Sequence, residues 1–293
     1  MKKFILEIFI IFITVLFLGE TTTRVFELKS QHFDFITEDK DGYYSYKQFS
    51  TGEYVFGKPP SVIRTNFRIN DIGFNSKLDF EKMEINKINI AFIGDSFVES
   101  FHVDNRSTFS SILMNKFDKI QAYDFGFSGY SLSDYIRIYN SYKLENFDHV
   151  FILIGIDDIN TNSTVGKFDR NKEYLREIYN SLHFLNYLNL NHNLIQKFIN
   201  VLKVNKIKPN YLVKKISSVQ KIFLKKSNIT VVPKNKEILH FLNKENISNA
   251  IKIKHNRKPY DFGLMDGHWN ENGRKNIIDS IIPFINNKLL INQ

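Results

Sequence analysis

The sequence predicts an α/β fold in which parallel strands alternate with helices, and two observations predict it. Short apolar runs rich in β-branched and aromatic residues occur at 88–93, 122–125 and 149–154. Helical patterns near 108–117 and 133–144 separate these runs. Because parallel strands need a long crossover between them, this alternation favours a parallel sheet over a series of hairpins.

Several residues mark where these helices begin. Thr108 and Ser133 precede helical patterns as N-cap residues, whose side-chain oxygens accept hydrogen bonds from free backbone amides. In the second half of the chain one further strand is expected at 229–232. A last helix follows Asn270, contains Pro283 and completes the fold.

The composition indicates a folded chain and limits its chemistry. The chain has 293 residues, of which 43% are hydrophobic and 24% are charged, so it can bury a core and is not disordered. It contains no cysteine. Disulfide frameworks, zinc ribbons, iron–sulfur clusters and cysteine nucleophiles are therefore excluded, and any nucleophile must be an oxygen or an amine.

The N-terminus carries a long apolar run. Lys2 and Lys3 precede the run from Phe4 to Gly19, which as a helix would rise about 24 Å against a hydrocarbon core of about 30 Å. Bulky residues occupy the places where a signal peptidase requires small ones, so we expect an uncleaved anchor over 1–20. A cleaved signal peptide is the alternative. With an anchor, we expect the two lysines to stay in the cytoplasm. The rest of this single-pass protein is then expected outside it, in the periplasm or outside the cell.

Two regions follow the expected anchor. Residues 21–60 are polar and aromatic without a sustained period, and we expect an extracytoplasmic stalk or wrapping segment. Residues 61–293 form the α/β domain, with a helical insertion at about 161–227.

The net charge of +9 comes from one segment, because residues 178–236 hold eleven lysines and no Asp or Glu. Its pattern predicts an amphipathic basic helix. Its apolar positions are Leu212, Ile216, Val219 and Phe223, and its basic positions are Lys214, Lys221 and Lys225. The simplest interpretation is a solvated face over a core stripe. The alternative is contact of the lysine-rich segment 197–236 with anionic lipid or an acidic polymer; nucleic acid is not expected outside the cytoplasm.

A candidate nucleophile follows the first strand. The apolar run 90–93 leads into Gly94, Asp95 and Ser96, so a serine lies where a buried parallel strand ends, which is the usual ligand position in open α/β sheets. Glycine permits a tight turn, and a following helical turn directs free amide hydrogens at the atom that the hydroxyl attacks. The alternative role of Ser96 is that of a helix N-cap.

A candidate base lies near the C-terminus. Asp266 and His268 precede the last helix, and an acid and a histidine two positions apart suit a general base with its orienting carboxylate. The alternative is a surface turn with an exposed histidine. The other seven histidines have no such neighbour and are predicted to lie at the surface or in packing contacts; they are His32, His102, His149, His183, His192, His240 and His255.

Two further fragments end the second and third strands. They are 124–130, which contains Gly129, and 155–158, which contains Asp157. Because the carboxyl ends of parallel strands share one edge of the sheet, all four fragments are expected to converge there.

In these residues the chain resembles the SGNH, or GDSL, family of esterases and acylhydrolases, over about residues 61–285. Ser96 matches the nucleophile of the first block, Gly129 matches the glycine of the second, and Asp266 with His268 matches the last. The stretch 64–74 is similar to the lead-in of membrane-anchored bacterial members.

The resemblance implies a three-layer α/β/α fold with a flavodoxin-like sheet of about five parallel strands. It also implies a serine esterase that uses no metal and no cofactor, acting on an acyl ester such as an O-acyl glycan or a lipid-like ester. The oxyanion hole is then formed by the backbone amides of Ser96 and Gly129 and by a third-block side chain.

The third block departs from the family. Asp157 replaces the asparagine whose side-chain amide donates to the oxyanion, and an ionised carboxylate cannot donate. Three outcomes stay open: an apolar site holds Asp157 protonated, Asn160 or Asn162 replaces it, or activity is low.

Two other functions are compatible with the same residues. A sugar hydroxyl in place of water would make the protein an O-acyltransferase that modifies a surface polysaccharide. Asp157 and the lysine-rich insertion would also suit a non-catalytic glycan-binding or assembly protein on an SGNH scaffold.

Overall fold

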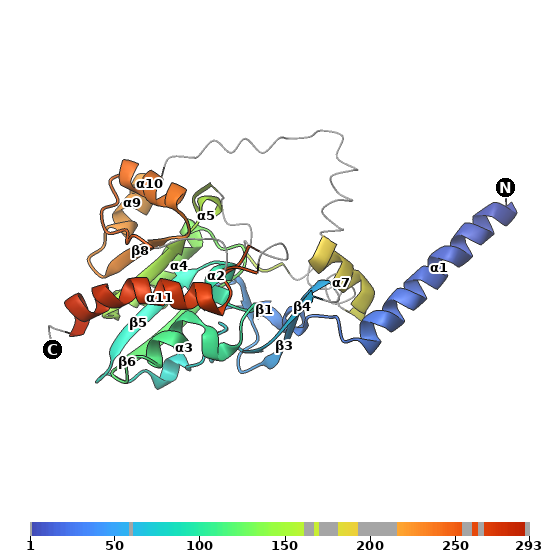
Figure 1. Cartoon of the computed structure of the whole chain (residues 1–293), viewed down its shortest axis with the longest axis horizontal. Helices are drawn as coiled ribbons and strands as arrows, with labels where there is room; N and C mark the ends of the chain where they lie inside the picture. Colours follow the sequence, from blue (N-terminus) through green and yellow to red (C-terminus); the bar gives the residue numbers. More distant parts are fainter. Residues whose placement is uncertain are drawn as a thin grey trace. The chain divides into compact units, whose positions relative to one another are not determined.

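Figure 1 shows the computed structural model of the chain. The structure describes residues 2–58, 61–160, 167–169, 181–192, 216–253, 260–262 and 267–290. The chain divides into two compact units. The smaller comprises 1–36, 52–65 and 169–210, and the larger comprises 37–51, 66–168 and 211–293.

The smaller unit is built on the N-terminal helix α1 (Lys2–Val25) and on α7 (His183–His192). The carboxylate of Glu20 on α1 accepts hydrogen bonds from the backbone amides of His183 at 3.2 Å and Phe184 at 3.0 Å. These bonds satisfy two amides that the first turn of α7 leaves without partners inside the helix. The end of α1 is thereby joined to the start of α7.

Most of α1 has apolar, exposed side chains, and its mean hydropathy reaches 2.2 over an 18-residue window. By length and composition the helix can cross a membrane, and a signal sequence passes the same test. The helix extends past Gly19 through the threonine cluster to Val25.

Short elements follow α1 in the sequence and precede the first strand of the main sheet. Strand β1 (Ile36–Glu38) pairs with β2 (Tyr44–Tyr46), and β3 (Thr51–Lys58) pairs with β4 (Ser61–Arg68). The helical turns of this region are η1 (Gln31–Phe35) and η2 (Phe80–Lys82). The sequence showed no sustained period over 21–60, where strands of three to eight residues are separated by turns.

The larger unit contains a parallel sheet with strand order β6-β5-β7-β8. The strands are β5 (Ile88–Gly94), β6 (Ile120–Gly126), β7 (His149–Ile154) and β8 (Ile229–Pro233), and each includes a predicted apolar run. This order is that of flavodoxin-like sheets. The strand after β5 is added on one side of β5 and the later strands on the other, so β5 and β7 flank the topological switch point.

The described residues contain four strands of this sheet where about five were expected. The segment 249–251 lies in the fifth place, beside β8. It is joined there by a parallel bridge between Val231 and Ala250 and by two backbone hydrogen bonds of Val231, at 3.0 and 3.1 Å. Within the residues that the structure describes, a single bridge therefore stands in the place of the expected fifth strand.

Helices cover both faces of the sheet, so the expected three-layer α/β/α arrangement is confirmed (Figure 1). Helices α3 and α11 cover one face, and α4 and α9 the other. Their bounds are α2 (Ser96–Glu99), α3 (Phe109–Met114), α4 (Leu132–Ser141), α5 (Ile156–Asn160), α9 (Ser218–Leu224), α10 (Lys236–Lys244) and α11 (Glu271–Ile285), which contains Pro283. The short turns are η3 (Asn105–Ser107), η4 (Leu144–Asn146) and the π-helical η5 (Asn286–Leu290).

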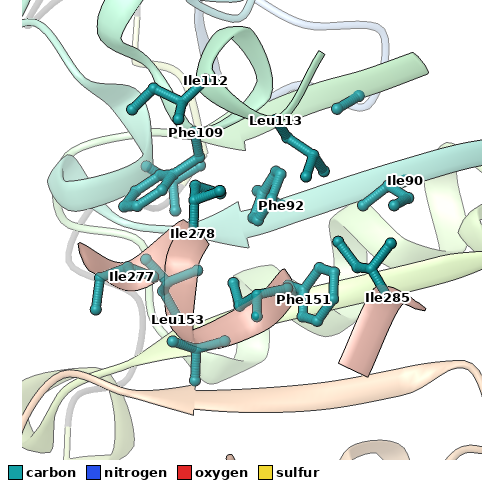
Figure 2. Close-up of a cluster of buried hydrophobic side chains, with 14 of the residues drawn as sticks. Ile90, Phe92, Phe109, Ile112, Leu113, Phe151, Leu153, Ile277, Ile278 and Ile285 are labelled. Carbon is teal, nitrogen blue, oxygen red and sulfur yellow. The ribbon is translucent and has the colours of Figure 1, made fainter. Parts of the chain in front are cut away.

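The core on the α3 and α11 side follows from strand alternation. Alternate residues of β5 point to this face, and Phe92 stacks on Phe109 of α3 at 5.6 Å and on Phe151 of β7 at 5.5 Å between ring centroids. Figure 2 shows these rings close to Ile277 and Ile278 of α11. Each fully buried side chain of this size contributes about 1.5–3 kcal/mol to folding.

The helix starts agree with the sequence in one case and not in the other. Thr108 caps α3, as predicted, because its hydroxyl accepts from the amide of Ser111 at 3.3 Å. The prediction of Ser133 as the cap of α4 is wrong: the N-cap is Ser131, whose amide donates to Asp134 at 2.8 Å. An acid three residues after Ser131 completes a capping box, which decides where the helix begins.

The predicted basic helix is only partly realised, because α9 has two turns and Val219 is 66% exposed instead of lying on a core stripe. Its buried residues are Phe223 and Leu224, and the Phe223 ring meets Tyr139 of α4 at 5.3 Å. Lys221 is paired with Glu245 at 2.6 Å. Residues 197–215 of the lysine-rich segment, with most of the expected insertion, lie outside the described residues.

The buried histidine of β7 gives a prediction on pH. His149 is inaccessible to solvent and hydrogen-bonds to Thr230 through Nε2 at 2.8 Å. Burial, aided by the positive charge of Lys288, lowers the pKa of His149 to about 3 from 6.5. The unfolded chain therefore binds a proton first. The contribution of neutral His149 to the free energy of unfolding is complete above pH 6.5. As the pH falls from 6.5 towards 3, that free energy decreases by about 1.4 kcal/mol per pH unit.

Urea unfolding of the full chain in detergent at several pH values tests this dependence. His149→Asn should flatten it between pH 6.5 and 4, whereas substitution of the exposed His240 by Asn should leave it unchanged. Equal slopes in the wild type and His149→Asn would contradict the assignment.

Candidate active site

The candidate nucleophile lies in a tight turn at the carboxyl end of β5. Asp95 precedes α2 and caps it, because its Oδ1 accepts from the amide of Phe97 at 3.1 Å. Ser96 is the first residue of α2 and is half-buried. The predicted strand–turn–serine arrangement is therefore present at the expected edge of the sheet.

Ser96 and His268 are within hydrogen-bond distance. The Oγ atom of Ser96 lies 2.7 Å from Nε2 of His268, although 172 positions separate them in the sequence. His268 directly precedes α11, whose N-cap Asn270 also donates to the backbone oxygen of Asp261 at 2.8 Å. The structure thus brings together the two residues whose meeting the sequence analysis required. Asp266, the predicted orienting acid, lies outside the described residues.

Two rings pack against His268. The ring of Phe97 is 4.6 Å away between centroids, and the ring of His102 is stacked on it at 4.1 Å and 13°. His102 is 7% exposed, and the sequence analysis placed it among histidines without a functional neighbour. His102 is thus in a packing contact, as predicted, but its partner is the candidate base, which the sequence analysis did not anticipate.

The loop of Gly129 is attached to the nucleophile turn. Gly129 has φ +85°, a backbone conformation that favours glycine. The amide of Phe127 donates to Gly94 at 3.4 Å, and the amide of Ser128 donates to Glu99 of α2 at 2.9 Å. The backbone amide of Gly129 therefore belongs to a loop that is held beside Ser96.

Glu99 is the centre of this attachment and is almost fully buried. Besides the Ser128 amide, its carboxylate accepts from the hydroxyl of Ser128 and from that of Tyr46 at 2.8 Å. Burial raises the pKa of Glu99, and the hydrogen bonds from Ser128 and Tyr46 oppose the rise. A Cβ at Gly126 would overlap the backbone of Glu99, so the strand end and α2 approach closely only because residue 126 is glycine.

A buried arginine joins the helix after His268 to the turn of Ser96. Arg274 of α11 donates to the backbone oxygen of Phe97 at 2.8 Å and to the hydroxyl of Ser100 at 2.6 Å. Burial lowers the pKa of Arg274 to about 10. Ser100, with φ +68°, ends α2 in the left-handed region, and the bond from Arg274 holds it there.

A buried lysine lies under the same turn. The Nζ atom of Lys234 is 2.7 Å from Asp95 and 3.1 Å from Asp158, and only 9% of the lysine is exposed. Burial by itself would lower the pKa of Lys234, but the two carboxylates outweigh it and the net shift is upward. The ammonium therefore stays charged and fixes Asp95, the cap of the nucleophile helix.

A cavity of about 700 Å³ is lined by the chain neighbours of Ser96 (Asp95 and Phe97) and of His268 (Gly267 and Trp269). Asp157, on α5, lines it and is exposed, so it is not enclosed by apolar side chains as its protonated alternative requires. Asn162 lies outside the described residues. The lining residues are Asp95, Phe97, Gly155, Ile156, Asp157, Asp158, Lys234, Asn235, Lys236, Glu237, Asp261, Gly267 and Trp269.

Three residues around the turn were missed by the sequence analysis. Lys234 directly follows strand β8, so the rule that strand ends share one edge could have found it. Glu99 lies one turn after Ser96, which is a weaker signal. No signal in the sequence pointed to Arg274, because its role depends on how α11 packs. Over the described ranges, no cluster of three or more His, Asp or Glu side chains could hold a metal ion.

Comparisons with known proteins find structural likenesses only. No protein-family model matches this chain, and no curated protein sequence matches it. A lipolytic protein of the G-D-S-L family from Veillonella parvula is 12% identical, with a TM-score of 0.36, over 68% of this chain and 98% of that one. The psychrotrophic esterase EstA from Pseudoalteromonas sp. is 13% identical, with a TM-score of 0.35, over 71% and 100%.

An acetylxylan esterase from Geobacillus stearothermophilus is 14% identical, with a TM-score of 0.34, over 69% of this chain and 96% of that one. At such identities and TM-scores these likenesses assign no reaction. The reaction of this chain is therefore inferred from its own side-chain geometry.

The buried lysine gives the prediction for this site. Lys234→Met should lower the free energy of unfolding by about 3–5 kcal/mol, because it leaves Asp95 and Asp158 buried without their cation. Lys236→Met, two residues away and exposed, is the matched control and should change it by less than about 0.5 kcal/mol. Urea unfolding midpoints measure both, and equal midpoints would show that the lysine does not support the turn.

Proposed function

We propose that this chain is a serine esterase of the SGNH type. The observation that carries the proposal is the 2.7 Å contact between Ser96 Oγ and His268 Nε2 at the carboxyl edge of a parallel sheet. A hydroxyl becomes a useful nucleophile when an adjacent imidazole accepts its proton, and a serine and a histidine at hydrogen-bond distance beside a cavity are suited to that step.

In the proposed mechanism neutral His268 takes the proton from Ser96 as its oxygen attacks the carbonyl carbon of an ester. The tetrahedral intermediate collapses, and His268 gives the proton to the leaving alcohol oxygen. Water then attacks the acyl enzyme with His268 again as the base, which releases the carboxylic acid and restores the serine. Asp266 is proposed to orient the imidazole and to stabilise its charged form.

The negative charge on the carbonyl oxygen needs donors that are already in place. We propose the backbone amides of Ser96 and Gly129 for this role. Glu99 supports it by holding Ser128, the neighbour of Gly129, against the nucleophile helix. The third donor position falls to Asp157, which cannot donate when ionised.

The substrate class that fits the cavity is an O-acyl ester on a hydroxyl-rich molecule. Much of the lining of the 700 Å³ cavity is carboxylate, ammonium and amide groups, which exchange hydrogen bonds with sugar hydroxyls. An O-acyl glycan is therefore the proposed substrate. A sugar hydroxyl in place of water would turn the same chemistry into acyl transfer.

The place of action is proposed from the N-terminus. Helix α1 is proposed as a single-pass anchor, with its N-terminus in the cytoplasm and the hydrolase domain, 61–293, in the periplasm or outside the cell. Residues 21–60 then connect the two. The exposed Val219 and Ile222 of α9, with the exposed Lys225 at its end, support a role for the lysine-rich segment at an anionic lipid or acidic polymer surface.

The first prediction concerns the proposed nucleophile and base. Ser96→Ala and His268→Ala should each lower kcat/KM for p-nitrophenyl acetate by about 10⁴-fold or more, because each removes one half of the activated pair. His240→Ala, at an exposed site on α10, should keep full activity. Labelling by a fluorophosphonate probe should disappear with Ser96→Ala. Full activity in either active-site variant, with unchanged circular dichroism, would refute the proposal.

The second prediction concerns Asp157, whose exposed carboxylate also suits a non-catalytic glycan-binding protein. Asp157→Asn should raise kcat by up to about 100-fold, because an amide can donate to the oxyanion and removes a repelling charge. Glu237→Gln removes another carboxylate from the same cavity and is the matched control. If both variants gave the same small change, Asp157 would not face the oxyanion. A wild type that neither labels nor turns over, but binds glycan, would favour the binding protein.

A further inference from the structure

The larger unit contains a second cavity, of about 760 Å³, which we name the Tyr46 cleft. Five segments of the unit form it, and none of its lining residues belongs to the cavity beside Ser96. Its lining residues are Thr37, Glu38, Asp39, Lys40, Ser45, Tyr46, Lys47, Gln48, Phe49, Ile72, Phe80, Glu81, Ser141, Tyr142 and Lys143. Its volume lies within the range of small-molecule binding sites, about 300–1,000 Å³.

Aromatic side chains supply much of the apolar surface of the cleft. Tyr46 and Tyr142 are buried, whereas Phe49 is 63% exposed. Exposed aromatic rings beside polar groups are suited to stacking on the apolar faces of sugar rings. Phe49 is therefore available to stack on a ligand that enters the cleft.

The lining of the cleft holds three lysines and three carboxylates, and one of the carboxylates is paired with an arginine outside the lining. Asp39 is neutralised by Arg137 at 3.0 Å, which leaves three lysines and the carboxylates Glu38 and Glu81. Lys40 donates to the backbone oxygen of Ser141 at 2.9 Å, so its charge is not compensated by a carboxylate there. In the part of the chain that the structure describes, Lys47 and Lys143 form no ion pair, and both are exposed. The cleft thus offers ammonium groups to an anionic ligand.

Two residues of the cleft have unfavourable backbone conformations. Phe49 has φ +59° and Lys143 has φ +50°, and over the described ranges only five residues other than glycine have positive φ. Such conformations cost roughly 1–3 kcal/mol each and tend to occur at functional sites. A third member of this group is Ser100, which ends the nucleophile helix. The other two, Glu27 and Asn246, line neither cavity, so two of the five positions belong to the cleft.

A short chain of hydrogen bonds connects the cleft to the candidate active site. Tyr46 lines the cleft, and its hydroxyl donates to Glu99 at 2.8 Å. The same carboxylate holds Ser128, next to Gly129. The cleft therefore lies two side chains away from the loop that is proposed to bind the oxyanion.

We propose that the Tyr46 cleft binds a segment of an acidic polysaccharide, the same polymer that carries the acyl ester. The exposed phenylalanine stacks on a sugar ring, the ammonium groups of Lys47 and Lys143 pair with carboxylate groups of the polymer, and the carboxylates of the cleft accept from its hydroxyls. This assignment rests on the proposed esterase function for the identity of the polymer, and on the cleft alone for its binding.

The test uses the full chain in detergent micelles and titration calorimetry with two hexasaccharides. Hexagalacturonate is the acidic probe and maltohexaose the neutral one. We expect the wild type to bind the acidic probe, and Lys47→Glu combined with Lys143→Glu to weaken that binding by about tenfold or more, because two attractions become repulsions. Phe49→Ala should weaken it as well. Lys77→Glu combined with Lys119→Glu is the matched control on exposed sites outside the cleft and should have no effect.

Other outcomes overturn the proposal. Binding of maltohexaose as tight as that of hexagalacturonate would remove the role of the lysines. Equally tight binding of inorganic polyphosphate would show a general anion surface without sugar recognition. Loss of binding with Lys225→Glu and Lys226→Glu, but not with the cleft variants, would place the polymer on the lysine-rich segment. Hydrolysis of p-nitrophenyl acetate by the same preparation reports separately on the esterase, so failure of one proposal does not imitate failure of the other.

Discussion

The hydrogen bond between Ser96 and His268 requires two segments from distant parts of the sequence to meet to within a few tenths of an ångström. The turn of Ser96 is restrained on several sides to make this possible. Lys234 fixes the cap of its helix, Arg274 joins its last residues to the helix that follows His268, and Glu99 ties it to the loop of Gly129. The geometry of the pair is therefore a property of the packed sheet edge and not of either segment alone.

These restraints are charged side chains in a buried setting, which is an expensive way to build a turn. An isolated buried charge is costly, and removal of one partner leaves the others without compensation. Charged groups nevertheless form directional hydrogen bonds, which fix the orientation of the segments that they join. A carboxylate that accepts three hydrogen bonds, as Glu99 does, positions a loop more narrowly than apolar contacts of the same size, because hydrogen bonds weaken steeply with angle. Apolar packing is concentrated on the sheet faces, beneath α3 and α11, where direction matters less.

The two cavities of the larger unit differ in character and share one connection. Five carboxylates line the cavity beside Ser96, and two of them, Asp95 and Asp158, are paired with Lys234. The Tyr46 cleft is richer in ammonium groups and holds an exposed phenylalanine. Glu99 lies between the Tyr46 hydroxyl and the loop of Gly129, so one buried carboxyl group contacts the wall of one site and the backbone of the other. A polymer with acidic sugars and neutral acyl groups matches both charge patterns.

Apolar runs that recur between helical patterns determined the parallel sheet, since periodicity is local and survives in the sequence. Gly94, Ser96 and Gly129, which follow or end strands, also predicted the edge of the sheet at which the candidate site residues lie. Only the tertiary structure decided the rest. Asp134 completes a capping box with Ser131, so Ser131 and not Ser133 caps α4. Val219 lies on the short helix α9 and is exposed. The turn after α2 places the ring of His102 against that of His268. Arg274 and Lys234 act across long sequence separations, and no local pattern records which buried charges will face each other once the layers have packed.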